Sequence, residues 1–501
     1  MALDASTFET ISPCRRFITF TIPNPISSDS SSPLLRVAVL DSPIQQQQEQ
    51  VAAMFVPQGR ESDWIFSTQS GQLQLLFTSP TSISRFILIG PNHFNFKFND
   101  HHHHHDDDDD DFSLQRRVYR RPSKNCSLQQ QQQFEVWSKP LLLALSPRHL
   151  FRNGIPHIPI LSYQDNLVSS LVIHQCVGSR VGQLLVEDVE IEIEIEMAEG
   201  VEIESEGGEE VRTREFRRRM RFKRMPNFIQ TEIPIVPERD PGSNGARIGG
   251  VVGFVPDIRV LVHPYLPPMV ASLSLISEYL DGRIRNGFRP RALCLGVGGG
   301  ALITFLTTQL GFDVVGVDSD REVLRVAKRY FGLEEGDCTR VVVGDAIKYL
   351  KNLACHGRLP NMNSFVDCEL NGSLDGDVVN HKFDVVMVDL DSSDIRSGMS
   401  SPPLEFVRKN VLLDAKLALS ETGILAINVI PPTKSFYENL VNHFLQVFQE
   451  LYKIDVGNGE NFVLIAAASP QEFPVGNCGN SFLKRLKSVI PEANINSITK
   501  I

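Results

Sequence analysis

The sequence predicts an α/β fold for residues 251–501, preceded by a β-rich region at residues 1–238 that carries low-complexity insertions. Beyond a Gly- and Pro-containing linker at residues 239–250, apolar runs of strand length alternate with amphipathic runs of helix length. Such alternation is typical of a parallel sheet covered by helices. In the same region a glycine cluster, GVGGG at residues 296–300, joins an apolar strand to an apolar helix.

The composition limits the classes of function. A chain of 501 residues has room for two or three domains, and 42% hydrophobic with 22% charged residues is typical of a globular protein. The formal net charge of -11 argues against a general nucleic-acid binder, which is usually basic. No segment approaches the unbroken apolar run of about 20 residues that a membrane helix needs. We therefore expect neither a specific nucleic acid nor a membrane as partner.

The eight cysteines include no Cys-x-x-Cys pair. This spacing predicts reduced thiols in a cytoplasmic protein and neither a disulfide framework nor a metal site. The N-terminal residues lack the basic and apolar regions of a secretory signal. Histidines and aspartates at 101–111 form a tract that can bind metal, but such repeats are more often solvated loop expansions.

In the first half, short strand-like runs are separated by inserts at about residues 41–50, 97–133 and 196–211. Residues 186–195 alternate apolar residues with Glu, and residues 212–224 alternate basic with apolar residues. We expect these two segments to form a β-hairpin, with the acidic strand paired to the basic strand and one face in solvent. A nucleic-acid surface is the alternative for the basic run, and its acidic neighbour makes this less favoured.

The second half contains the elements of the expected parallel sheet. Predicted strands cover residues 292–297, 313–318, 340–345, 382–390, 423–430 and 461–468, and predicted helices cover 269–280, 301–310, 321–331 and 346–353. Residues 355–381 contain few apolar residues and are expected to form a loop insertion.

The glycine cluster indicates a ligand that approaches the backbone closely at a helix N-terminus. As Gly-x-Gly-x-x-Ala it fits the pyrophosphate of a dinucleotide, and as Gly-x-Gly-x-Gly it fits the methionine part of S-adenosylmethionine. The loop alone leaves both alternatives open.

Three aspartates at successive strand ends favour S-adenosylmethionine. Asp318 is placed for the ribose hydroxyls, as it would be in a dinucleotide enzyme. Asp345 follows the next strand and is placed to accept from an adenine amino group, and Asp389 ends the following strand near the expected methyl position. Each aspartate alone could instead be a helix N-cap. Their succession after a glycine loop makes coincidence much less plausible.

Residues 251–468 resemble the seven-strand class I methyltransferases, in particular their spermidine-synthase-like branch. The resemblance implies a Rossmann-like sheet whose last strand is antiparallel. It assigns the methionine part to Gly296, Gly298 and Gly300, the ribose to Asp318, and the adenine to Asp345 and Ala346. Many class I enzymes carry an acid two residues before the first glycine, where this chain has Cys294.

Longer segments resemble the methyltransferase-like protein 13 family, notably FVPQGRESDWIFSTQSGQLQLL at residues 55–76 and LVHPYLPPMVASLSLI at residues 261–276. That family has two methyltransferase domains, which act on a lysine and on the N-terminal α-amine of translation elongation factor 1-alpha. This chain has one glycine loop and resembles the C-terminal domain with its preceding region. The resemblance therefore implies α-amine methylation of that factor; the first half is expected to recognise substrate or form a homodimer.

We expect Asp389 to orient the amine, with Asp391 as a second catalytic carboxylate and with Asp394 shaping an acidic mouth for a cationic N-terminus. His263 and Tyr265 are candidates for closing the cofactor site, although His263 could equally be structural. An α-amine has a pKa of about 7.7–8.0 and a lysine about 10.4, so presenting a neutral α-amine costs about 3 kcal/mol less. No strong base is required.

Two other functions compete with methylation. An aminopropyltransferase of similar fold would carry an acid inside the glycine loop, where this chain has Gly299. A non-catalytic, S-adenosylmethionine-binding scaffold is compatible with Cys294 but less so with the intact aspartates.

Overall fold

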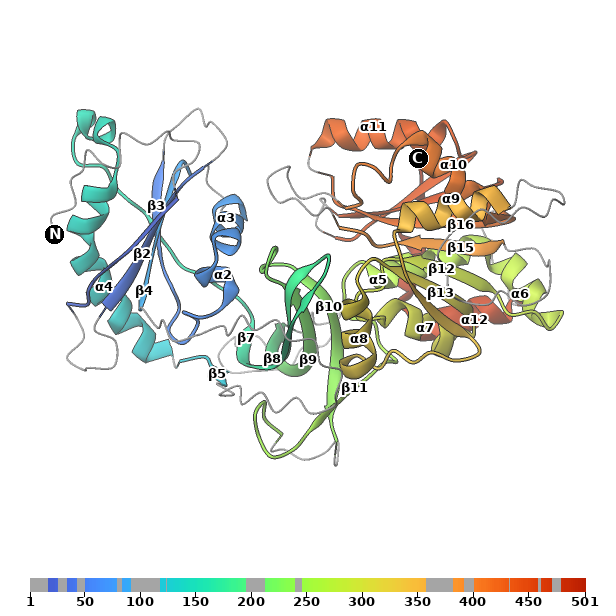
Figure 1. Cartoon of the computed structure of the whole chain (residues 1–501), viewed down its shortest axis with the longest axis horizontal. Helices are drawn as coiled ribbons and strands as arrows, with labels where there is room; N and C mark the ends of the chain where they lie inside the picture. The colour runs from blue at the N-terminus through green and yellow to red at the C-terminus, as the bar shows by residue number, and fades with distance from the viewer. Residues whose placement is uncertain are drawn as a thin grey trace, which may run out of the picture.

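The computed structural model describes residues 17–25, 34–42, 50–78, 83–91, 118–122, 124–194, 212–238, 246–356, 382–391, 401–431, 433–457, 461–470 and 479–501. Three sheets follow one another along the chain (Figure 1). The His/Asp tract at 101–111, the segment 196–211, most of the predicted loop at 355–381, and Asp394 lie outside the described residues.

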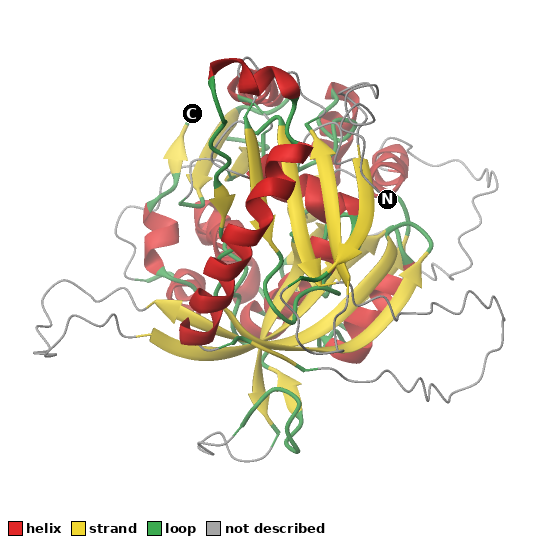
Figure 2. Ribbon diagram, turned by 90° about the vertical axis from the view of Figure 1, so that its left-hand side faces the viewer, coloured by secondary structure: helices red, strands yellow, loops and turns green. Residues whose placement is uncertain are grey.

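The first sheet has strand order β1-β2-β4-β3-β6 and carries helices on both faces (Figure 2). Its strands are β1 (Phe17–Pro23), β2 (Leu34–Asp41), β3 (Val51–Phe55), β4 (Arg85–Pro91) and β6 (Ile160–Leu161). Helices α2 (Trp64–Ser67) and α3 (Gln69–Thr78) contribute to the core on one face, and α4 (Lys124–Leu145) covers the other. Helix α4 begins inside the segment 97–133 that we expected to be an insert. Glutamine is a good helix former, and the apolar end of α4 anchors it to the sheet.

The second sheet is antiparallel, with strand order β11-β10-β9-β8-β7-β5. It consists of β5 (Tyr119–Arg120), β7 (Leu167–Gly178), β8 (Gly182–Glu194), β9 (Arg212–Phe222), β10 (Ile229–Pro237) and β11 (Phe254–Pro256). Strand β11 follows the predicted linker yet pairs with β10, so the sheet extends past the boundary that we placed at residue 250.

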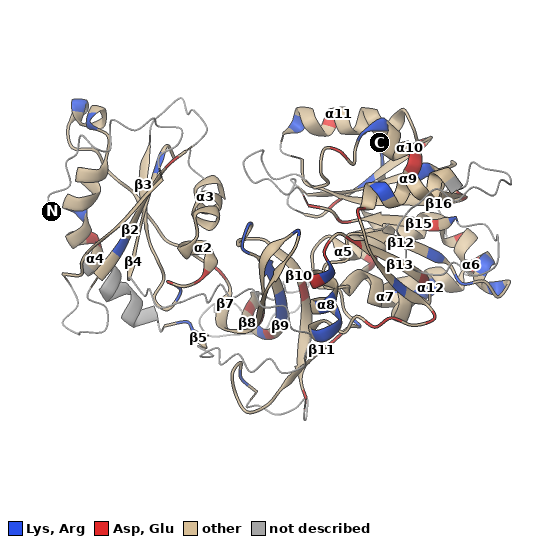
Figure 3. Ribbon diagram, in the orientation of Figure 1, with Lys and Arg blue, Asp and Glu red and all other residues tan. Residues whose placement is uncertain are grey.

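The predicted acidic and basic hairpin is confirmed, since β8 pairs with β9 and places Asp188 opposite Arg218. The expectation of a solvent-exposed face is wrong for the middle of the hairpin. Asp188 and Arg218 form a buried ion pair at 2.6 Å, and Glu187 and Arg221 form another at 2.8 Å. Both faces are covered there because the hairpin lies between the other two parts of the chain (Figure 3).

The third sheet has strand order β14-β13-β12-β15-β16-β18-β17-β19. Its strands are β12 (Arg291–Leu295), β13 (Asp313–Asp318), β14 (Thr339–Val343), β15 (Phe383–Val388), β16 (Leu419–Val429), β17 (Glu450–Asp455), β18 (Phe462–Ala467) and β19 (Thr499–Lys500). Strands β12 to β16 are parallel, and β18 is antiparallel to both β16 and β17. The predicted α/β fold with an antiparallel last strand is confirmed; the short edge strand β19 was not predicted.

Helices cover both faces of the third sheet. One core contains residues of α5 (Leu266–Ala271), the 3-10 helix Ser272–Ile276, α6 (Ser277–Arg285), α7 (Ala301–Leu310) and α12 (Ser481–Val489). The opposite core contains residues of α9 (Ala346–His356), α10 (Lys409–Ala418) and α11 (Lys434–Leu445). Helix α8 (Arg321–Tyr330) contributes to the first of these cores and to a core shared with the second sheet. The short helix α13 (Glu492–Asn496) precedes β19.

Polar contacts join the first sheet's helices to the second sheet. Arg221 donates to Asp63 at 3.0 Å, and the Ser70 hydroxyl donates to the Lys223 carbonyl at 2.9 Å. The Asn227 amide donates to the Gln74 side chain at 3.1 Å. Helix α3 and the residues before it therefore fix the turn between β9 and β10. No described helix is long and apolar enough to cross a membrane.

Replacing Arg218 by Met is expected to lower the free energy of unfolding by about 3–5 kcal/mol, because Asp188 becomes a buried charge without its partner. Arg218 also donates to the Tyr330 carbonyl at 2.8 Å, so the change loosens the second sheet from α8. The measurement is urea unfolding followed by tryptophan fluorescence.

The matched control is Arg214→Ala, near the start of the same strand, where the arginine is 60% exposed and pairs with Glu190. It should change the free energy by less than about 1 kcal/mol. Equal losses for the two variants would contradict the structural role given to Arg218.

Candidate functional site

A cavity of about 530 Å³ lies where the carboxyl ends of the parallel strands meet the second sheet. Ligands of doubly wound sheets bind at this edge. Nine of the sequence-predicted site residues line the cavity: Gly296, Gly298, Asp318, Asp345, Ala346, Asp389, Asp391, His263 and Tyr265. The tenth, Gly300, does not line it, and Asp394 lies outside the described residues.

The glycine loop after β12 passes very close to the end of β15. Gly296 has φ +87°, and a Cβ built there would lie 1.9 Å from the Asp389 carbonyl oxygen. The loop is also held from the second sheet, since the Gly299 amide donates to the Thr231 hydroxyl at 2.7 Å. Gly300, with φ +81°, faces Leu333 and precedes α7. Its contribution is therefore to the shape of the loop.

Asp318, at the end of β13, holds the glycine loop in place through hydrogen bonds to its backbone. Its Oδ2 accepts from the amides of Val297 and Gly298 at 3.1 and 3.3 Å. Burial raises the pKa of Asp318, and these backbone hydrogen bonds partly oppose the shift. Asp345, exposed at the end of β14, accepts from the Lys348 amide at 2.9 Å and so caps α9. Asp318 and Asp345 both line the cavity, so each can hold its backbone amides and also face a ligand.

Asp389 is the centre of a hydrogen-bonded cluster at the end of β15. Its Oδ2 accepts from the Tyr265 hydroxyl at 2.7 Å, and its Oδ1 accepts from the Asn428 amide at 3.3 Å. Burial raises the pKa of Asp389, against the effect of these two donors. Burial and the Asp389 charge raise the pKa of Tyr265 well above its usual value, so its hydroxyl remains a donor. The cluster fixes the direction of the carboxylate.

Asp391 lies two residues further along. Asp391 is exposed at the cavity, yet the surrounding protein raises its pKa to about 6, chiefly by desolvation and then by the Asp389 charge. Arg224, at the cavity wall, acts in the opposite direction. The negative charge of Asp389 therefore disfavours ionisation of Asp391, and the protonation of the two carboxylates is coupled.

His263 combines the two roles predicted for it, a structural histidine and a residue of the cofactor site. Its Nε2 lies 3.0 Å from the Ile229 carbonyl oxygen, and its ring lies 4.5 Å from the Tyr265 ring. Burial lowers its pKa, which favours the neutral imidazole. The histidine thus links strand β10 to Tyr265 and also forms part of the cavity wall.

Further polar residues line the cavity and were missed by the sequence analysis, among them Arg224, Gln230, Glu405 and Asn428. Arg224 and Gln230 come from the second sheet, and Asn428 comes from the end of β16. Asn428 had a usable signal, because it is a polar residue inside the apolar run of a predicted strand. Arg224 had none, since it is one of many basic residues in its segment. Cys294 is buried in the core, where burial raises its pKa to about 12.

The sequence is similar to curated methyltransferases over most of its length. It is 24% identical to the eEF1A lysine and N-terminal methyltransferase of Danio rerio over 84% of this chain and 51% of the relative. The human protein of the same name is 22% identical over 89% of this chain and 55% of the relative. The predicted resemblance is thus confirmed, and the chain spans about half the length of these relatives.

A shorter similarity links the chain to the polyamine aminopropyltransferase of Vibrio vulnificus, at 25% identity over 37% of this chain and 53% of the relative. Among solved structures, human methyltransferase-like protein 13 in complex with SAH is 23% identical, with a TM-score of 0.36 over 47% of this chain and 93% of that one. No family model matches the chain.

Replacing Asp391 by Asn is expected to raise the melting temperature at about pH 7.5 more than at about pH 4.5. A carboxyl whose pKa is raised from 3.8 to about 6 on folding destabilises the folded state progressively as pH rises between these values. The asparagine side chain cannot ionise, so the variant lacks this destabilisation, which is complete only above about pH 6. Differential scanning calorimetry across this range measures the effect.

The exposed Asp337, replaced by Asn, controls for the loss of one negative charge. A melting temperature that Asp391→Asn changes equally at both pH values would contradict the environment described for Asp391.

Proposed function

We propose that the protein is an S-adenosylmethionine-dependent protein N-methyltransferase that acts on the N-terminal α-amine of elongation factor 1-alpha. The observation that carries the proposal is one cavity lined by the glycine loop, by Asp318 and Asp345, and by the held carboxylate of Asp389. The similarity to curated methyltransferases supports the same class of reaction.

The residues of the cavity fit the cofactor. The glycine loop provides a cradle that a side chain at Gly296 would fill, since its Cβ would collide with the Asp389 carbonyl. Gly296 and Gly298 would hold the methionine part, Asp318 the ribose, and Asp345 with Ala346 the adenine. When bound, S-adenosylmethionine supplies a methyl group activated by its sulfonium. Gly300 would act only by shaping the loop, because it does not reach the cavity.

Asp389 would orient the substrate amine. Its carboxylate already has one direction, because Tyr265 and Asn428 each donate to one of its oxygens. An amine N–H that donates to Asp389 would be held in the cavity, with the nitrogen lone pair left free to receive the methyl group. Positioning of this kind supplies much of the rate in group transfer. Because an α-amine is partly neutral near pH 7.5, a fixed acceptor is sufficient.

Acidic groups would select a cationic N-terminus. Asp391 and Glu405 line the cavity together with Asp389, and Arg224 balances part of their charge. An incoming ammonium group is attracted to this region and loses its proton to solvent before transfer. We infer the substrate from the name of the relatives, eEF1A lysine and N-terminal methyltransferase, which covers both a lysine and an N-terminal activity. A cytoplasmic location, predicted from the cysteines, agrees with such a substrate.

Polyamine synthesis is the second candidate, favoured by the similarity to the Vibrio vulnificus aminopropyltransferase. It is less well supported, because the chain has Gly299 where those enzymes are expected to have an acid, and Gly299 is packed against Thr231 and Phe331. An acidic side chain at this position would have no room in the present loop.

Methyl transfer from labelled S-adenosylmethionine tests the proposal. Elongation factor 1-alpha with a free N-terminus should be labelled, and the acetyl-blocked factor should not be. In a parallel assay with decarboxylated S-adenosylmethionine as the aminopropyl donor, putrescine should yield no spermidine. Asp389→Asn should lower kcat by about 100-fold, since it removes a positioned acceptor, while S-adenosylhomocysteine still binds. Asp345→Asn should instead weaken binding of the cofactor and leave kcat less affected.

Labelling of both the free and the blocked factor would point to a lysine and contradict the α-amine assignment. Spermidine formation would replace the proposal by the second candidate. Cofactor binding without transfer to any of these substrates would favour a scaffold.

A further inference from the structure

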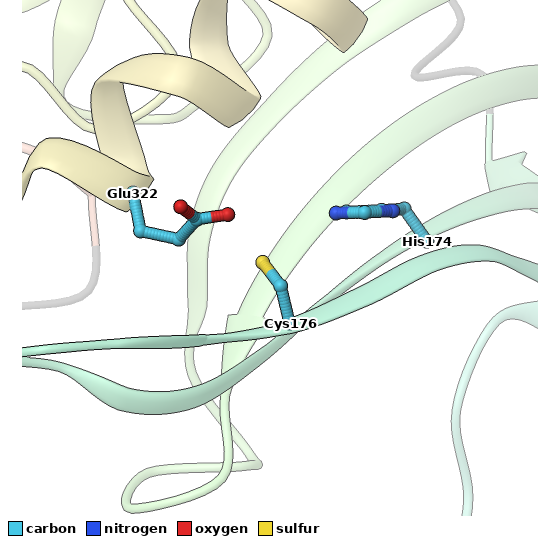
Figure 4. Close-up of side chains that lie close together, drawn as sticks. All are labelled: His174, Cys176 and Glu322. Carbon is cyan, nitrogen blue, oxygen red and sulfur yellow. The ribbon is translucent and has the colours of Figure 1, made fainter. Parts of the chain in front are cut away.

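We propose that His174, Cys176 and Glu322 form a zinc site that joins the second sheet to helix α8 (Figure 4). Within the described part of the chain, these three residues are the group whose potential ligand atoms, one per residue, lie within 4.8 Å of one another. The site is separate from the cavity, as none of the three residues lines it.

The backbone brings the three side chains together by simple periodicity. His174 and Cys176 are two residues apart on strand β7, so their side chains project from the same face of the sheet. Glu322 lies in the first turn of α8, which packs on that face through Val323 and Val326. Figure 4 shows the Cys176 sulfur between the Glu322 carboxylate and the His174 ring.

The donor set selects the metal. Imidazole nitrogen, thiolate sulfur and carboxylate oxygen are the usual ligands of zinc, whereas calcium and magnesium require oxygen ligands. Zinc binds these atoms at about 2.0–2.3 Å in a tetrahedron, which places ligand atoms roughly 3.3–3.8 Å apart. The observed spacing of up to 4.8 Å therefore requires a contraction of about 1 Å, within reach of side-chain torsions. Water would complete the four ligands.

Neighbouring groups hold two of the ligands in orientation. The His174 ring stacks on the Tyr330 ring, with centroids 4.9 Å apart and an interplanar angle of 29°. Arg325 donates twice to Oε1 of Glu322, and the Cys176 thiol also hydrogen-bonds to this carboxylate, so the cysteine and the glutamate are already in direct contact. Such support is typical of metal ligands. The Cys176 thiol loses its proton to solvent as the zinc–sulfur bond forms, and no redox step is involved.

The site would reinforce a junction that is already present. Asp320, the N-cap of α8, accepts from the amides of Arg180 and Val181 in the turn between β7 and β8, at 2.6 and 3.0 Å. Zinc would tie strand β7 to the same helix at Glu322, two residues after Asp320. The cysteine spacing predicted no zinc site because this one uses a single cysteine together with a histidine and a glutamate.

Cobalt substitution tests the proposal on the full chain. The five histidines at 101–105 are a second potential metal ligand, so all variants carry serine at those positions. Titration with Co²⁺ should produce a thiolate-to-cobalt charge-transfer band at one equivalent, and Zn²⁺ should displace it and raise the melting temperature. Histidines and carboxylates cannot produce that band.

Cys176→Ser should abolish the band, and His174→Phe, which preserves an aromatic ring beside Tyr330, should weaken Co²⁺ binding at least about tenfold. Glu322→Gln should weaken it similarly. Cys338→Ser, at a half-buried cysteine elsewhere in the same half of the chain, should leave the band unchanged. The proposal is overturned if the parent protein shows no charge-transfer band, or if Cys338→Ser removes the band and Cys176→Ser does not.

Discussion

The buried hydrogen bond from the Gly299 amide to the Thr231 hydroxyl, 2.7 Å long, holds the glycine loop against a strand of the preceding sheet. The cavity depends on this contact, because one wall belongs to the parallel sheet and the other to the antiparallel sheet. A side chain in place of Gly298 would meet the same Thr231 hydroxyl at 2.8 Å. The second sheet is therefore part of the site and cannot be regarded as an appended module.

That contact requires strand β10 to keep its position, and buried ion pairs hold the strand there. Arg217 and Arg219 of β9 both bind Glu232, the residue after Thr231, at 2.7 and 2.5 Å. Arg221 of the same strand reaches Asp63 in the first part of the chain. Buried ion pairs contribute little net stability but penalise any other register, since each slip would leave charges without partners. This explains why an acidic strand pairs with a basic one.

Much of the fold could be predicted from local patterns. The alternation of strands and helices, the glycine loop and the acidic–basic hairpin are each encoded within short segments, and the structure confirms them. The position of Asp389 at the end of a strand could be predicted for the same reason. Its partners Tyr265 and Asn428, and the wall residues Arg224 and Gln230, belong together only through long-range packing. The helix α4 was missed because low-complexity glutamines carry no periodic apolar signal. Strand β11 was not predicted, because its three residues are identified as a strand only by their pairing with β10.

Hydrogen–deuterium exchange of the full chain, with and without S-adenosylhomocysteine, tests the composite site most directly. With the ligand bound, we expect slower exchange in two segments at once, the glycine loop at residues 296–300 and the strand at residues 229–232. The Gly299–Thr231 contact couples these segments. Protection of the glycine loop alone would show that the antiparallel sheet lies outside the site. Unchanged exchange in both segments, under conditions in which the ligand binds, would contradict the location of the cofactor altogether.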